Sequence, residues 1–181
     1  MCVIDHAPDI RDEIATERLN LRRARTSDAA AIVRLASDFA ICSMSTRMPF
    51  PYGLGDAEAF VRLVSAQKRE RENTFVIDNG DDGVVGVLGF HQPPDAPLEM
   101  GYWIGRPYWG RGYATEAARA ALGWAGNDWR RKMVVAGHFA DNAASANVLV
   151  KSGFLYTGEV QKRHSRARRK VVATRMMVWL A

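Results

Sequence analysis

A glycine-rich passage from a predicted strand into a predicted helix is the feature that most constrains the fold. The segment EMGYWIGRPYWGRGYATEAARAAL begins at Glu99, runs through Gly105, Gly110 and Gly112, and continues as an alanine-rich helical stretch. Glycines in such a turn let backbone N–H groups point inward without side-chain obstruction, and the following helix adds the positive end of its dipole. The passage therefore predicts an anion-binding site at the start of the helix, where several N–H donors converge.

The surrounding sequence argues against two common kinds of phosphate site. Tyr113-Ala114-Thr115 stands where a nucleotide triphosphatase loop would have its Lys and its Ser or Thr. The order of predicted elements also lacks the successive βαβ units of a dinucleotide fold. A short Gly-x-Gly by itself is common in tight turns, so the rest of the chain must decide what this one does.

Seven segments have the apolar pattern of strands. They cover residues 19–25, 74–78, 84–91, 98–104, 132–139, 154–160 and 171–180. The sequence NGDDG at 79–83 predicts a hairpin between the second and third strands, because Asn and Gly accept positive φ angles. PPDAP then ends the third strand, since proline cannot continue the hydrogen-bond ladder.

Four segments predict helices. The cluster TSD can cap the first, and a long Pro- and Gly-containing loop from Ile41 to Gly55 leads to the second, which we expect Asp56 to cap. The third runs from Tyr113 to Trp124, and the fourth lies in DNAASANVLVKSG. The apolar residues expected on one face are Ile32, Leu35, Ala36 and Phe39 in the first helix, and Phe60, Leu63 and Val64 in the second. We see no repeat or internal boundary, so a single domain over residues 1–181 is expected.

The glycine-rich turn resembles the coenzyme A-binding turn of the GNAT acyltransferase superfamily, Q/R-x-x-G-x-G/A, with Gly112 and Ala114 matching. Trp109 stands where that turn usually has Gln or Arg, and YWGRGYATEA is similar to the form typical of the Rim-type branch, which contains ribosomal-protein N-terminal acetyltransferases. TERLNLRRA resembles the T-x-R-L-x-L-R opening of that branch. A further block resembles its N-x-x-S-x-x-x-L-x-K-x-G-F signature, at Asn142, Ser145, Asn147, Leu149, Lys151, Gly153 and Phe154.

This resemblance implies an α/β (α+β) GNAT fold. Its sheet would be mixed, mostly antiparallel and seven-stranded, splayed between strands 4 and 5 and flanked by about four helices. The splay would expose backbone groups that pair with the pantetheine arm of acetyl-CoA, the implied donor. The implied donor-binding residues are Trp103, Ile104, Trp109, Gly110, Arg111, Gly112, Tyr113, Ala114, Thr115, Asn142, Ser145 and Lys151. For Asn142 the alternative is helix capping alone.

The resemblance also implies direct transfer of the acetyl group to an amine. Such transfer needs a base for the amine and a proton donor for the departing thiolate. Glu99 is the candidate base, acting through water, and the alternative is a cross-strand polar contact. Ser145 is the candidate acid, and it could instead only hydrogen-bond the thioester sulfur. His91 and His138 end strands near the expected cleft, where packing is the more common role, and neither has the spacing of a metal ligand.

The net charge of +5 is concentrated in one short segment, from Lys162 to Lys170. A solvated loop, a surface for a polyanion and a rim that attracts phosphates all remain open as interpretations. The absence of interleaved aromatic residues disfavours nucleic acid as a partner. With the loop from Ile41 to Gly55, the turn from Gln161 to Lys170 is expected to flank the acceptor, favouring acceptors with carboxylate or other acidic groups over polycations.

The expected activity is acetyl transfer from acetyl-CoA to a primary amine, with no metal. The acceptor is a protein N-terminal α-amine or a small-molecule amine; α-amines are favoured because about one in ten is neutral at pH 7. The alternative is an acyl-CoA-binding regulatory protein of the same fold without turnover. A homodimer remains open, and no sequence signal distinguishes it from a monomer.

The sequence predicts a cytoplasmic protein without a membrane span. No stretch approaches the roughly 20 apolar residues that a span needs, and MCVIDHAPDIRDEIA is acidic where a secretory signal would be basic and apolar. No disulfide is expected between Cys2 and Cys42. Cys42 is expected to be a packing residue, since no neighbour in FAICSMST could act as its base.

Overall fold

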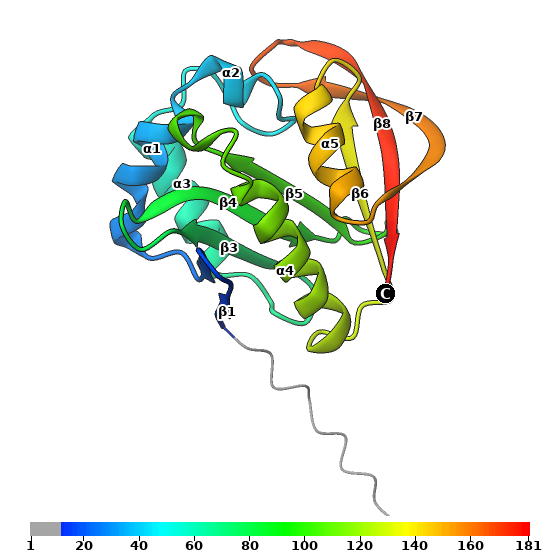
Figure 1. Cartoon of the computed structure of the whole chain (residues 1–181). Helices are drawn as coiled ribbons and strands as arrows, with labels where there is room; N and C mark the ends of the chain where they lie inside the picture. The colour runs from blue at the N-terminus through cyan, green and yellow to red at the C-terminus, as the bar shows by residue number, and fades with distance from the viewer. Residues whose placement is uncertain (1–11) are drawn as a thin grey trace, which may run out of the picture.

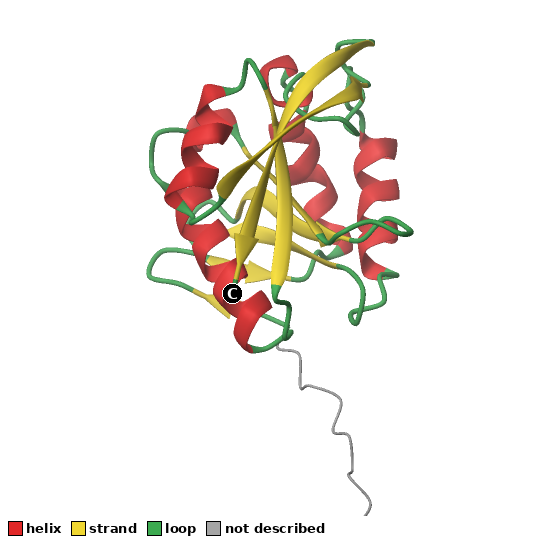
Figure 2. Cartoon of the chain, turned by 90° about the vertical axis from the view of Figure 1, so that its right-hand side faces the viewer, coloured by secondary structure: helices red, strands yellow, loops and turns green. Residues whose placement is uncertain are grey.

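Eight strands form one twisted sheet, with helices on both of its faces (Figures 1 and 2). The computed structural model describes residues 12–181. All neighbouring strands are antiparallel except β5 and β6, and the spatial order is β1-β2-β3-β4-β5-β6-β8-β7. The strands are β1 (Ile14–Ala15), β2 (Asn20–Arg22), β3 (Asn73–Asp78), β4 (Val84–His91), β5 (Glu99–Ile104), β6 (Met133–Phe139), β7 (Leu155–Ser165) and β8 (Lys170–Leu180).

The predicted fold class is confirmed, and the element counts differ slightly. The sheet gains an eighth strand because Ile14 and Ala15 pair with β2 at its edge. The predicted first helix divides into two, because Asp38 accepts a hydrogen bond from Ala40 N–H (2.9 Å) and so caps a new helix. The helices are α1 (Ala29–Ala36), α2 (Phe39–Cys42), α3 (Leu54–Ser65), α4 (Tyr113–Asn127) and α5 (Ala143–Lys151), with 3₁₀ turns η1 (Thr26–Asp28) and η2 (Arg106–Tyr108).

Two of the expected apolar contacts are wrong. Phe39 starts α2 rather than extending α1, and it is 49% exposed, with its ring against Phe50 at a centroid distance of 5.1 Å. Leu63 is 64% exposed, because the buried stripe of α3 runs through Ala57, Val61 and Val64 instead. The predicted cap of α3 is also wrong. The cap position is Gly53, and Asp56 lies in the first turn, where its carboxylate accepts the Gly53 N–H (2.9 Å).

The splay between the fourth and fifth predicted strands is confirmed as a divergence of β5 from β6. Along β4, β5 pairs at all of its residues, from Glu99 to Ile104. Toward β6, the ladder within residues 12–181 consists of the pair Glu99 and Val135, next to a hydrogen bond from Val135 N–H to Leu98 O (2.8 Å). The β6-facing backbone of β5 is therefore open between this point and Ile104.

Each face of the sheet has its own core. Met100 and Ile104 of β5 pack with the buried alanines of α4, and the partly buried Tyr102 packs against the same core. Trp103 points the other way and packs with the core beneath α1 and α3. Because successive strand residues face opposite sides, Glu99 lies on the Trp103 face and Tyr102 on the α4 face. The splay is thus approached by different side chains from its two sides.

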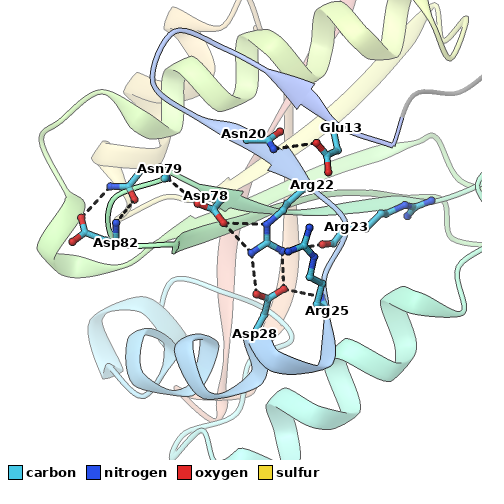
Figure 3. A network of polar contacts seen from close by, with 10 residues as sticks. Glu13, Asn20, Arg22, Arg23, Arg25, Asp28, Asp78, Asn79 and Asp82 are labelled. Atoms are coloured by element: carbon cyan, nitrogen blue, oxygen red, sulfur yellow. Dashed lines mark hydrogen bonds and ion pairs between the residues drawn. The ribbon is translucent and has the colours of Figure 1, made fainter.

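A buried ion network joins β2, η1 and β3 (Figure 3). The Arg22 guanidinium donates to both carboxylate oxygens of Asp28 (2.9 and 3.0 Å) and to Asp78 (2.9 and 3.0 Å). Burial would raise the pKa of Asp28, but the hydrogen bonds from Arg22 and from Arg25 N–H outweigh it and lower this pKa. The carboxylate therefore stays charged and holds β2, η1 and β3 together.

Candidate active site

The predicted anion-binding turn lies between the end of β5 and the start of α4. Gly110 and Gly112 have φ angles of 76° and 81°, in the left-handed region, and Gly112 is the cap residue of α4. A Cβ at Gly110 would meet no described atom within 4 Å, so the turn is open to a ligand there. The first N–H groups of α4, from Tyr113 onward, have no acceptor earlier in the helix. These features suit a bound anion such as a pyrophosphate, and the anion site stays a prediction.

Trp109 and Arg111 belong to this turn and contact residues that precede it in the chain. The indole Nε1 of Trp109 donates to Ile104 O (2.7 Å) and so closes the loop that leaves β5. The Arg111 guanidinium lies over the Tyr108 ring, 5.4 Å from its centroid, and remains exposed. Both residues are predicted to bind acetyl-CoA. In the structure the Trp109 indole stabilises the turn, and the Arg111 guanidinium is exposed at the surface next to the turn.

The Glu116 side chain joins the first turn of α4 to the segment between β1 and β2. Its carboxylate accepts hydrogen bonds from Thr16 Oγ1 (2.6 Å), from Arg18 N–H (3.0 Å) and from Arg18 Nε (2.7 Å). Arg18 also donates to Arg111 O (3.0 Å) and lies over the Tyr113 ring. Two motifs that are far apart in the sequence, TERL and YATEA, are therefore one structural unit that orients the first turn of α4.

The start of α5 faces the splay from the α4 side. Asn142 caps α5, and its Oδ1 accepts the Ser145 N–H (3.0 Å). The Ser145 hydroxyl lies 2.9 Å from the Tyr102 hydroxyl, and either oxygen can be the donor. Burial raises the pKa of Tyr102 to about 12, against the smaller opposite effect of the Ser145 hydrogen bond, so the phenol stays protonated at neutral pH. The sequence analysis missed Tyr102, although strand alternation places it on this face.

Glu99 lies on the opposite face of the sheet, in an ion pair that the sequence did not predict. Arg163 of β7 donates to both of its carboxylate oxygens, at 2.5 and 3.2 Å, and the Glu99 and Arg163 side chains are 15% and 24% exposed. The Arg163 guanidinium passes close to Gly137 of β6, where a Cβ would lie in ordinary van der Waals contact with its Nη1, at 3.5 Å. Both carboxylate oxygens therefore have a partner, and a water-mediated role would use their remaining lone pairs.

A cavity of about 320 Å³ opens beside this ion pair. Its lining residues are Thr46, Arg47, His91, Pro93, Glu99, Arg163 and His164. His91 is the cross-strand neighbour of Glu99 and shares its face. Burial lowers the pKa of His91, and the charge of Arg47 lowers it further, so its imidazole is neutral at pH 7. The cavity thus combines a neutral imidazole, a paired carboxylate and an additional guanidinium.

The basic segment is a hairpin rather than a loop. Lys162 to Ser165 extend β7, Lys170 begins β8, and only residues 166–169 form the turn. The hairpin contacts the loop that follows α2, through bonds from Ser165 Oγ to Ser45 O (3.0 Å) and from Arg166 N–H to Thr46 O (3.2 Å). The backbone of most of this segment is therefore paired in the sheet, although its charged composition suggested a solvent-exposed loop.

The remaining predicted residues differ in how close they lie to the splay. Trp103 and Ile104 are at the open end of β5, and Ala114 and Thr115 are in the first turn of α4. Lys151 ends α5 with an exposed side chain, and its carbonyl accepts two bonds from Arg119 (2.7 and 2.9 Å). The fold thus gathers the predicted donor residues around the splay, with Lys151 at the far end of α5.

His138 and Cys42 pack in the core, as the sequence favoured. His138 is buried and has both ring nitrogens engaged, with Phe139 O (2.9 Å) and with the Tyr156 hydroxyl (3.0 Å). Cys42 is buried next to Ala36 O, and burial, with a smaller effect of Asp38, raises its pKa to about 11. Cys2 lies outside the described residues.

Residues 12–181 contain neither a metal-binding cluster nor a membrane-spanning helix. No cluster of three His, Cys, Asp or Glu side chains has the arrangement of a metal site in this part of the chain. Across the same residues, the helices are too short or too polar to cross a membrane.

The match to a known family model decides which family the chain belongs to. Residues 18–155 match the Acetyltransferase (GNAT) domain family. The chain belongs to the GNAT acetyltransferase family. It is accordingly an acyltransferase that uses acetyl-CoA as its donor, as the motifs predicted. Among curated proteins it is similar to p20 of Bacillus licheniformis, an uncharacterised N-acetyltransferase, with 26% identity over 151 residues that cover 81% of this chain and 84% of p20.

Solved structures share this fold over nearly the whole chain. Mycobacterium smegmatis RimJ in complex with CoA-disulfide superposes with a TM-score of 0.82 at 24% identity, covering 96% of this chain and 90% of that one. Spermidine N-acetyltransferase from Vibrio cholerae in complex with CoA and spermine superposes with a TM-score of 0.76 at 17% identity, covering 91% and 96%. A member of the predicted Rim-type branch thus shares the fold, and so does an enzyme named for a polyamine.

Proposed function

We propose that this GNAT acetyltransferase transfers the acetyl group of acetyl-CoA directly to a primary amine, with the donor on the α4 face of the splay and the acceptor on the Glu99 face. The observation that carries the proposal is the divergence of β5 from β6 next to the Glu99 and Val135 pair. It provides an opening between two faces with different chemistry. Protein N-terminal α-amines and small-molecule amines both fit this proposal.

On the donor side, the chain supplies backbone and hydroxyl groups. The turn at Gly110 and Gly112 would hold the pyrophosphate, and the open β6-facing edge of β5 would pair with the pantetheine amides. Acetyl-CoA supplies the activated thioester. Ser145, held by Asn142 and Tyr102, would direct its hydroxyl to the sulfur, either as the acid or as a hydrogen-bond donor.

On the acceptor side, Glu99 would accept the amine proton through water. The Arg163 pair supports this assignment because it fixes the carboxylate at the start of β5, where the splay begins. A base in a fixed position acts in the transition state without a further loss of conformational freedom.

The test is release of the coenzyme A thiol in a screen of primary amines. Acetylation requires thiol release that depends on the amine and is matched by an acetylated product. Tight binding of acetyl-CoA without amine-dependent release for any acceptor would favour the regulatory alternative, in which the fold binds the donor without turnover.

A further inference from the structure

Three segments, in addition to β5 with Glu99, contribute charged or titratable side chains to the lining of the cavity beside Glu99. The loop after α2 contributes Arg47, the end of β4 contributes His91, and the β7 strand contributes Arg163 and His164. On the proposed function, this cavity receives the acceptor, because it lies on the Glu99 face. Its balance of charge therefore bears on which amines the enzyme selects.

Most of the hairpin arginines are engaged in structural contacts. Arg163 is neutralised by Glu99. Arg168 pairs with Asp141 (2.6 Å) and donates to Ser43 O (2.5 Å), and Arg166 donates to Arg47 O (3.2 Å). These contacts join the hairpin to the loop after α2. The basic hairpin thus contributes less free positive charge to the cavity than its composition suggests.

Arg47 is different. Its backbone is held on both sides, because its N–H donates to Ser45 Oγ (3.2 Å) and its carbonyl accepts from Arg166. Arg47 is one of the residues that line the cavity, and its guanidinium makes no hydrogen bond or ion pair with any residue in 12–181. Its charge also acts inside the cavity, since it is the largest charge effect on the pKa of His91, after burial.

We propose that the acceptor is a primary amine that also carries a carboxylate, and that Arg47 binds this carboxylate. The inference rests on the proposed function for the identity of the cavity as the acceptor site. The charges of Glu99 and Arg163 neutralise each other, so the positive charge of Arg47 is unpaired in the cavity. One carboxylate on the acceptor would neutralise it. A phosphate dianion would bring a second negative charge beside Glu99, and a polycation would be repelled by Arg47. A guanidinium presents two parallel N–H groups that fit a carboxylate.

The experiment uses linear amino acids from glycine to aminohexanoate, each compared with its own primary amide. It also compares alanyl peptides with Glu or Gln in the second position. Binding is measured by calorimetry in the presence of coenzyme A, which has no acetyl group to transfer, and kcat/KM is measured with acetyl-CoA. The variants are Arg47→Met, which removes the charge at similar length, and Arg169→Met, which removes an exposed hairpin charge outside the cavity.

We expect at least one acid to bind roughly three- to tenfold more tightly than its amide at low salt, with a smaller ratio at high salt. Arg47→Met should bring this ratio close to one, and Arg169→Met should leave it unchanged. Equal binding of every acid and amide, a ratio that survives in Arg47→Met, or tighter binding of a polyamine than of any acid would each overturn the inference.

The two proposals fail in different ways. Selective binding of acids through Arg47 without any amine-dependent thiol release would support the carboxylate site and reject amine acetylation. Turnover of amines without any preference for acids would support acetylation and reject the carboxylate site.

Discussion

The donor side and the acceptor side of the splay differ in how their residues are brought together. On the donor side, the turn from Gly105 to Gly112 takes its shape from neighbours in the chain, such as the bond between Trp109 and Ile104. On the acceptor side, Glu99 and Arg163 are 64 residues apart, and Ser45 and Ser165 are 120 residues apart. Short motifs therefore identify the donor turn, although distant contacts of Glu116 with Thr16 and Arg18 orient it, whereas no short motif identifies the partners of Glu99.

The largest effect is expected on the acceptor side, from Glu99→Gln. If Glu99 takes the amine proton, turnover should fall by about 10²–10⁴-fold. Donor affinity should change little, because Glu99 lies on the face opposite Tyr102 and Ser145. The loss should shrink at high pH, where more of the amine is already neutral. Rates as a function of pH and acetyl-CoA binding by calorimetry measure both effects.

A matched variant separates the charge of Glu99 from its structural pairing. Arg163→Met removes the partner and leaves the carboxylate in place. If Arg163→Met and Glu99→Gln lose activity equally and neither loss depends on pH, then the ion pair has a structural role and Glu99 is not the base.

The next largest effect is expected on the donor side, from Gly112→Glu. Acetyl-CoA should stabilise the wild-type protein by about 2.7 kcal/mol at a hundredfold excess over its dissociation constant. The variant should lose this stabilisation, because it adds a negative charge at the expected pyrophosphate position and a side chain at a φ of 81°. Thermal unfolding with and without acetyl-CoA is the measurement. Gly112→Ala, which shares the strained φ without the charge, is the control, and an undiminished shift in Gly112→Glu would contradict the donor assignment.

A smaller effect is expected from Glu116→Gln, which weakens the clamp between the two donor-side motifs. Hydrogen bonds to a charged group contribute roughly 1.5–3 kcal/mol, so stability should fall by about that amount. Burial opposes the charged form of Glu116, but the bonds from Thr16 and Arg18 outweigh it and lower the pKa of Glu116 below its ordinary value of 4.5. The carboxylate therefore stabilises the fold above about pH 4.5 and loses this effect as the pH falls through its folded pKa.

Chemical unfolding of Glu116→Gln and wild type at two pH values checks this sign. The difference in stability should be full at pH 7 and should shrink at pH 3. A difference that stays constant with pH would mean that the charge of Glu116 does not contribute to the clamp.

The smallest effects are expected from Tyr102→Phe and Ser145→Ala. Tyr102→Phe removes one hydrogen bond to Ser145, worth about 1 kcal/mol, and should lower kcat by roughly fivefold. Ser145→Ala should cost less than Glu99→Gln, because the thioester keeps part of its positioning. Single-turnover rates measure both variants. If Tyr102→Phe reduces activity in the Ser145→Ala background as much as in the wild type, Tyr102 does not act through Ser145.

The resemblance of the chain's motifs to the GNAT superfamily predicted the fold class, the splay and the family, which are confirmed, whereas the donor-binding role of the turn stays a prediction. Periodicity predicted the individual strands and helices, and glycines that accept positive φ angles predicted the tight turn. Local patterns also gave errors at apolar residues, which can be buried in the core or exposed at the surface. Phe39 has the spacing of a buried residue in a continuous helix, but Asp38 caps a new helix and exposes it. Leu63 is likewise one position away from the buried stripe of α3.

Only the tertiary structure decided the partners of the charged groups. Nothing near Glu99 in the sequence indicates Arg163, because the sheet order places two strands, β6 and β8, between β5 and β7. The tertiary fold also pairs the side chains of Arg166 and Arg168. It leaves the Arg47 guanidinium without a hydrogen-bond or ion-pair partner among residues 12–181. Local sequence fixes backbone shape through a few dihedral angles, whereas the charge of a cavity depends on which distant side chains meet there.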